Sequence, residues 1–245
     1  MDNVIKITLG LFIVILAGTV GFVVCNGYIS NSYSSSLTST YSYSLSITTD
    51  HPLTNVTFFI PVPADRKGNS PVVSLFSADA MPGVPESWST ILFDTGKATL
   101  IKIHVPAIIP PAGTTHTNPY TVTFSADIPS ETIIDTASPD ADDAAFRPVQ
   151  ELTKVACMGH SSGGNPECAT FLTSMYADYT ADPDTAVTIT SSIQGKNSWT
   201  VFEPRSNEYS MVTSLLLHGE NHGWATMKGT LERRIGSFDY PFHIS

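Results

Sequence analysis

The fold is decided by residues 41–48, which read YSYSLSIT. Apolar side chains occupy the odd positions, and hydroxyl side chains occupy the even positions. Because successive side chains of a strand point to opposite faces of its sheet, this alternation predicts a strand with one buried face and one hydroxyl-rich face. The strand ends at the sequence Asp-His-Pro over residues 50–52, and residues 54–62 form a second β-rich run. The two runs are predicted to pair as a hairpin.

Similar segments recur along most of the chain, separated by turn sequences rich in Gly, Pro, Asn and Asp. Further strands are predicted over residues 72–76, 89–93, 98–105, 120–126, 186–193, 198–202, 209–218 and 224–233. Many short strands with frequent turns are typical of two antiparallel sheets packed face to face. We therefore expect a mainly β protein in which residues 41–245 form an antiparallel β-sandwich.

The N-terminal region contains an apolar segment, residues 7–24, without charge or proline. As an α-helix it would be about 27 Å long, close to the ~30 Å hydrocarbon core of a bilayer. Lys6 precedes it and the next basic residue is Arg66, so the positive-inside rule predicts a cytoplasmic N-terminus and an extracellular C-terminal domain. We expect residues 1–25 to be a transmembrane anchor or uncleaved signal, and residues 26–40 a Ser-rich stalk. A cleaved signal peptide is the alternative, although no A-x-A-like site follows the segment.

The composition restricts the possible partners. The chain carries 12 basic and 22 acidic residues, a net charge of -10, and only 14% of its residues are charged, against about 25% in an average soluble domain. With so few cations, no surface for nucleic-acid phosphates is expected. The 28 Ser and 29 Thr residues account for the low charge, because we expect them on the outer faces of the strands.

Residues 147–179 show a different pattern. A proline near the start and Gly159 near the middle suit the ends of one helix, and Asn165 suits the cap of a second. We therefore expect a helical hairpin inserted in the sandwich. Cys157 and Cys168 flank its turn, and outside the cytoplasm such a pair predicts a disulfide.

Residues 159–163 read GHSSG, which matches the pattern G-x-S-x-G. This short motif resembles the nucleophile elbow of α/β-hydrolases. The resemblance implies Ser161 as the nucleophile, with Asp182 and His218 available in the chain order of that family. The elbow requires a preceding strand, whereas a helix is predicted here. A serine hydrolase is therefore the less favoured interpretation, and a tight turn the simpler one.

Two groups of residues suggest metal ions. Asp135, Asp140, Asp142 and Asp143 fall within nine residues, a density of carboxylates that could bind Ca²⁺ outside the cell. A solvated acidic loop is the simpler interpretation, because the EF-hand spacing is absent. Residues 218–222 read HGENH, whose alternating His, Glu and His could bind zinc, although the glycine and asparagine favour a hairpin turn.

No motif defines a convincing catalytic centre, so we expect a membrane-anchored cell-surface protein with a structural or interaction role in an envelope, in adhesion or in a surface complex. Its partners would be proteins or further copies of itself. An apolar N-terminal helix before a β head also resembles the architecture of pilin-like proteins. A filament subunit is therefore the alternative function. Pilins usually carry a basic residue and a glycine just before the apolar run, and here Lys6 is followed by Ile7.

Two smaller expectations concern the surface. Asn55 begins the only N-glycosylation sequon, inside a predicted strand. Trp88, Trp199 and Trp224 are interpreted as packing residues of the sandwich rather than as a platform for sugars.

Overall fold

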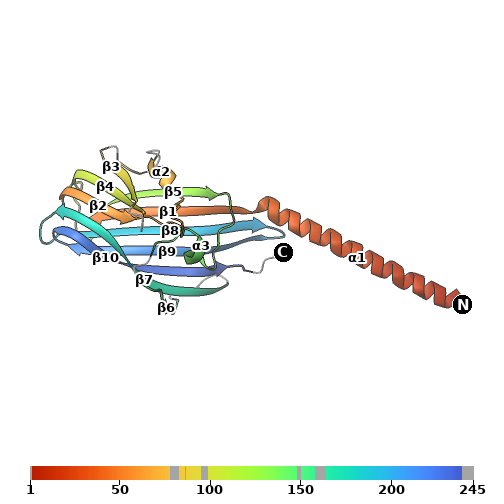
Figure 1. The fold of residues 1–245 in the computed structure, drawn as a ribbon. Helices are drawn as coiled ribbons and strands as arrows, with labels where there is room; N and C mark the ends of the chain where they lie inside the picture. The colour runs from red at the N-terminus through yellow and green to blue at the C-terminus, as the bar shows by residue number, and fades with distance from the viewer. Residues whose placement is uncertain are drawn as a thin grey trace.

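The computed structural model describes residues 2–77, 83–85, 87–94, 99–147, 150–157 and 164–238. A long N-terminal helix, α1 (Asp2–Ser36), projects from a head built almost entirely of strands (Figure 1). The strands are β1 (Thr38–Thr49), β2 (Leu53–Pro61), β3 (Ser89–Asp94), β4 (Thr99–Ile108), β5 (Tyr120–Ser130), β6 (Thr153–Val155), β7 (Gly164–Thr180), β8 (Ala186–Thr200), β9 (Pro204–His218) and β10 (Asn221–Gly236). Two short helices, α2 (Val73–Ser77) and α3 (Pro139–Asp142), lie in the connections. The mainly β composition and the apolar N-terminal helix agree with the prediction.

All these strands belong to one antiparallel sheet in the order β3-β4-β2-β7-β10-β9-β8-β1-β5, with β6 added beside β7. The sheet curls, so that the segment ahead of one edge strand approaches the other edge strand (Figure 1). Trp88, just before β3, packs against Phe124 of β5 with ring centroids 5.6 Å apart. The strand pairings therefore form one curled sheet around a common core, where we had expected two separate sheets.

The predicted hairpin of the first two strands is wrong. β1 pairs with β5 and β8, whereas β2 pairs with β4 and β7, so the turn at residues 50–52 carries the chain across the curl. The segment 72–76, predicted as a strand, instead contributes to helix α2. The hairpin error arises because local alternation identifies a strand but does not identify its neighbours.

The predicted break within residues 186–202 is also wrong, because a single strand, β8, runs through it. The turn-like residues have other roles there. Gly195 leaves space for the ring of Tyr209, since a Cβ atom at this position would lie 2.2 Å from that ring. Asn197 is buried, and its side-chain amide donates to the carbonyl of Ile134 at 2.8 Å and to the Asn207 side chain at 2.9 Å.

The helical hairpin predicted over residues 147–179 is also wrong, because the described residues of this range include two strands. Its second half is the 17-residue strand β7, and residues 153–155 of its first half form β6. The buried positions of β7 are the alternate ones, among them Phe171, Met175 and Tyr179. Leu172, which completes a helical stripe in the sequence, lies on the opposite, partly exposed face. Pairing with β2, β6 and β10 satisfies the backbone of β7 as a strand.

The inner face of the curled sheet forms one continuous hydrophobic core. It includes alternate residues of β1 together with Phe58, Phe124 and Ile101 from other strands, all fully buried. Gly229 of β10 lets the sheet close over the ring of Phe171, because a Cβ atom there would lie 2.3 Å from that ring. The hydroxyl residues of β1 alternate with the core residues, as predicted from the sequence.

Helix α1 continues to Ser36, so the residues expected to form a Ser-rich stalk are helical as far as that point. Only Leu37 separates the helix from β1. Ser36 Oγ accepts the Thr200 N–H and donates to the Thr200 carbonyl, both at 2.9 Å. The rings of Tyr33 and Trp199 lie 5.7 Å apart, and those of Tyr28 and Phe202 6.2 Å apart. The helix is therefore held against the turn between β8 and β9.

The apolar portion of α1 is not covered by any described residue of the head. Within residues 5–36 the helix is long and apolar enough to cross a membrane, and none of its most apolar window is buried. Such a helix can serve as a membrane span or as a signal anchor.

Candidate functional site

Of the three residues suggested by the hydrolase motif, the described part of the chain includes only Asp182 and His218. Ser161 lies outside the described residues. Asp182 lies in the turn after β7, where its carbonyl accepts the Thr185 N–H at 3.0 Å. His218 is the last residue of β9. No hydrogen bond or ion pair between described residues joins Asp182 to His218.

The predicted acidic cluster is divided among several partners. Asp135 Oδ1 accepts the N–H groups of Ala137 and Ser138, each at 2.9 Å. Asp143 accepts the hydroxyl of Tyr41 at 2.6 Å, which raises the pKa of Tyr41 in addition to the larger effect of burial. The Asp143 contact therefore fixes the segment between β5 and β6 onto β1, whereas Asp135 closes a local turn.

Asp140, in helix α3, forms an ion pair with Arg233 at 3.1 Å. Asp142 lies in the same short helix. Calcium binding by the four aspartates remains a prediction, and the described carboxylates already have protein partners.

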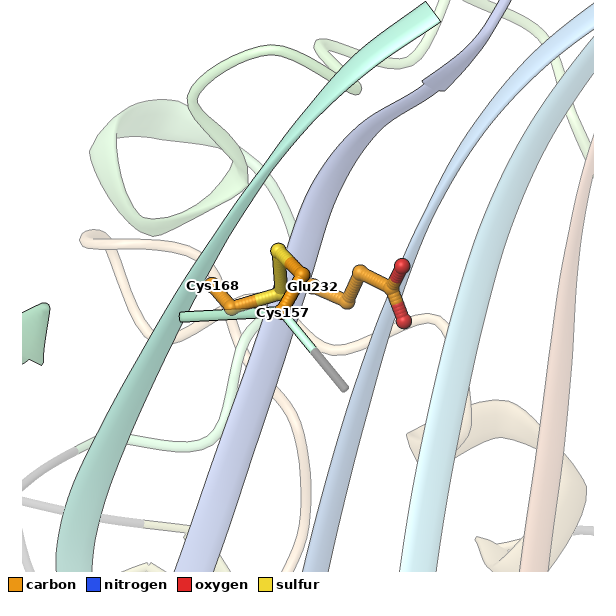
Figure 2. A group of neighbouring side chains, drawn as sticks. All are labelled: Cys157, Cys168 and Glu232. Atoms are coloured by element: carbon orange, nitrogen blue, oxygen red, sulfur yellow. A yellow bond between two sulfur atoms is a disulfide. The ribbon is translucent and has the colours of Figure 1, made fainter. Parts of the chain in front are cut away.

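Potential metal ligands come together at one other place in the described ranges. Ligand atoms of Cys157, Cys168 and Glu232 all lie within 4.8 Å of one another (Figure 2). The two sulfur atoms form the expected disulfide, 2.00 Å long, and so are not free thiolates. It links β7 to the residues just after β6, where Val155 pairs with Cys168. The disulfide thus stabilises a strand pair instead of the helical turn that we had expected.

The sequon residue Asn55 occupies an irregular position in β2. The register with β7 shifts between Thr54 and Thr57, and Asn55 has a left-handed φ of 54°. Its side chain is exposed. Glycosylation of Asn55 stays a prediction, on a bulge instead of a regular strand.

An unexpected feature lies on the outer face of the sheet, across β3, β2, β7 and β10. The rings of Phe93, Phe59, Tyr176 and Trp224 follow one another with centroid distances of 5.8, 5.6 and 5.7 Å. We call these four residues the aromatic row. Lys102 of β4 places its Nζ atom 5.8 Å from the Phe59 ring centroid. Trp224 is 65% exposed and Phe93 50% exposed.

A row of polar residues lies immediately beside the aromatic row. His104, Thr57, Asp178 and His222 are cross-strand neighbours on β4, β2, β7 and β10, and we call them the polar row. Thr57 Oγ1 lies 3.0 Å from His104 Nδ1, and Asp178 Oδ1 lies 2.7 Å from His222 Nδ1. The Tyr176 hydroxyl donates to Asp178 at 3.4 Å and thereby connects the two rows.

Electrostatics couples these polar groups. The hydrogen bond that the His222 imidazole donates to Asp178 is the main cause that raises the pKa of His222, and the nearby Glu220 carboxylate raises it further. Desolvation and Asp178 together raise the pKa of Tyr176. When the imidazole is protonated, the positive charge of His222 therefore offsets the negative charge of Asp178.

The two rows can contact a ligand in two ways. Exposed ring surfaces can pack on apolar C–H groups, while carboxylate, imidazole and hydroxyl groups can bond to the polar groups of the same ligand. Elsewhere on the outer face, β1 and β8 carry Ser and Thr at the corresponding positions, including Ser44, Ser192 and Thr190. The aromatic row thus differs from the hydroxyl-rich surface of β1 and β8.

Sequence reasoning missed this site. Trp88 and Trp199 pack as expected, but Trp224 is largely exposed on the outer face. The available signal was a polar and an aromatic residue two positions apart, and it occurs on three strands, as Thr57 with Phe59, Tyr176 with Asp178, and His222 with Trp224. Residues two apart share a strand face. No protein family, curated protein or solved structure matches this chain.

Proposed function

We propose that the protein is anchored in the cell membrane by α1 and displays its β head outside the cell, where the head has an interaction role. The observation that carries this proposal is the apolar helix, which none of the head residues that the structure describes covers. The first two-thirds of the helix expose large apolar side chains around its circumference, including Leu11, Phe12 and Val14 at more than 60%. Such a surface is stable in lipid and costly in water.

The remainder of α1 favours a head held away from the bilayer. Residues 26–36 continue the helix for about 16 Å beyond the apolar segment. The contacts of Ser36 and Tyr33 with the end of β8 then fix the angle between helix and head. A rigid arm of this kind suits a domain that presents a surface to an external partner.

The disulfide between Cys157 and Cys168 supports the extracellular placement of the head, because disulfides persist in oxidising compartments. The proposed orientation is based on the positive-inside rule, because Lys6 precedes the apolar segment while residues 25–65 contain no lysine or arginine.

Cys25 offers a direct test of this topology, because it is the only cysteine outside the disulfide and it immediately follows the apolar segment. A membrane-impermeant maleimide added to intact cells should label the wild-type protein and not the Cys25→Ser variant. In the Cys25→Ser background, a cysteine substituted for Asn3 should react only after the cells are permeabilised. The protein should also remain in the membrane pellet after alkaline carbonate extraction. The proposal would be contradicted if, in intact cells, the Asn3→Cys variant were labelled and Cys25 were not, or if carbonate released the protein from the membrane pellet.

A filament subunit is the second candidate function, favoured by the continuity of helix and head. Apolar helices that are unburied in the single chain can bundle with those of other copies, as in pilin-like fibres. Negative-stain microscopy of cell-surface preparations tests this alternative. Fibres lost on deletion of the gene would support it, whereas dispersed particles after extraction in detergent would exclude it.

A further inference from the structure

We propose that the aromatic row and the polar row together bind a neutral polysaccharide, with the exposed ring surfaces packing on C–H groups of its sugar units and the polar row bonding to their hydroxyl groups. This inference rests on the proposed function, because a displayed head meets surface polysaccharides, and it assigns a ligand class to the interaction role.

The arrangement of the exposed rings in a row favours a single extended polymer as the ligand. The aromatic row crosses five neighbouring strands, from β3 to β10, and its rings recur every 5.6–5.8 Å. Neighbouring rings are inclined to one another by 71°, 77° and 72°, so the row offers both ring edges and ring faces along one line. On β7 and β10 the row is only one residue wide, because Ser174 and Thr226 flank it on the side opposite the polar row. A stable protein interface covers about 800 Å² per partner, which is a broad patch and not a strip.

The charges of the two rows favour a neutral ligand. Asp178 is paired with His222, and Lys102 is placed over the ring of Phe59, so neither sign predominates. His104 and Thr57 bond to each other. An anionic polymer would be repelled by Asp178 and the nearby Glu220, while a cationic one would meet Lys102 and His222. A polyhydroxylated neutral chain can bond to carboxylate, imidazole and hydroxyl groups without placing a charge on any of them.

Co-sedimentation of the purified full-length protein with insoluble polysaccharides tests the proposal. The protein is kept in lauryldimethylamine oxide, whose headgroup contains no sugar, and the probes are microcrystalline cellulose, chitin and β-1,4-mannan. Depletion of the protein from the supernatant is expected with at least one of the three. The Trp224→Ala variant should bind that polysaccharide about tenfold more weakly, the effect of losing one well-packed aromatic contact. Soluble oligomers of the same sugar should protect the wild-type fluorescence from acrylamide, because Trp224 is the exposed tryptophan while Trp199 is buried.

Leu216→Ser is the matched control, because Leu216 is 56% exposed on the outer face of β9 and lies outside both rows. Equal binding by this variant and the wild type is expected. The proposal is overturned if none of the three polysaccharides retains the wild-type protein, or if both variants weaken binding equally. It is also overturned if light scattering finds an oligomer that Trp224→Ala dissociates while no polysaccharide binds, since the rows would then join copies of the chain. The Cys25 labelling experiment does not depend on any of these outcomes.

Discussion

The Asp50→Asn substitution tests how the loops at the end of the head remote from α1 are held together. The Asp50 carboxylate is only 2% exposed. It accepts the Ala186 N–H at 2.9 Å and lies 2.9 Å from His116 Nδ1 and 3.0 Å from His51 Nδ1. One carboxylate thus joins the turn after β1, the connection before β5 and the start of β8.

The expected magnitude follows from the ionisation of Asp50. Burial alone would raise its pKa, but the hydrogen bonds of His116, His51 and Ala186 outweigh burial and lower the pKa to about 2. An unfolded aspartate has a pKa of about 3.9, so the ionised carboxylate stabilises the folded state by about 2 kcal/mol. Because the folded pKa is the lower one, this contribution is present above about pH 4 and is lost as the pH falls through about 2.

Unfolding by denaturant, followed through tryptophan fluorescence at several pH values from 2 to 6, measures the effect. Asp50→Asn should lower the free energy of unfolding at pH 6, and its difference from the wild type should shrink by about 2 kcal/mol by pH 2. Asp184→Asn is the matched control, because Asp184 is exposed in the turn beside Ala186. A difference that stays constant over this pH range, or an equal pH dependence for Asp184→Asn, would refute the assignment of this stability to ionised Asp50.

Three further substitutions probe the sheet, the disulfide and the helix. Gly229→Ala should lower the free energy of unfolding by about 1–3 kcal/mol in denaturant titration, because its Cβ atom would overlap the Phe171 ring, and an unchanged midpoint would contradict this packing. Replacing Cys157 and Cys168 together with serine should cost about 3 kcal/mol by the same measurement, and reducing agent should shift the wild type alone. Ile13→Arg should cost about 2.5–3.5 kcal/mol of membrane insertion and release protein into the carbonate supernatant; full retention in the pellet would argue against a transmembrane α1.

Segments in which one periodicity dominates could be predicted from the sequence. The strict alternation over residues 41–48 specified a strand, and β1 extends only a few residues beyond it at the N-terminal end. The apolar segment 7–24 likewise specified a helix, because it is uninterrupted and charge-free. In the strand, burial of one face in the core requires the pattern that the sequence displays, and in the helix an uninterrupted apolar surface is the pattern that the proposed membrane span would require.

The error at β7 has a different physical origin. Phe171, Met175 and Tyr179 stand four residues apart, and a spacing of four satisfies both the helical and the strand period. The positions that decide between the two structures are Thr173 and Ala177, which are buried although neither is strongly apolar. Pairing with β2 and β10 therefore determines that β7 is a strand, and the local sequence pattern does not indicate this pairing.

The aromatic row could not be assembled from the sequence for a related reason. Its members come from four strands, and which strands are neighbours depends on registers that only the curled sheet fixes, such as Phe59 opposite Tyr176 and Tyr176 opposite Trp224. The local pattern of a polar and an aromatic residue two apart was present on three of the strands, but by itself it did not distinguish the core face from the outer face.

The composition of the outer face is the strongest reason to assign the aromatic row a role beyond folding. At comparable outward positions of β1 and β8 the chain uses Ser and Thr, which form strands well and leave no apolar surface exposed. A tryptophan that is 65% exposed and a phenylalanine that is 50% exposed contribute little to the core, and they add a site for unwanted association. Residues that oppose an otherwise consistent pattern mark the positions where function competes with folding. Substituting Trp224 should therefore impair ligand binding much more than stability, whereas the reverse is expected for Gly229 on the opposite face of the same strand.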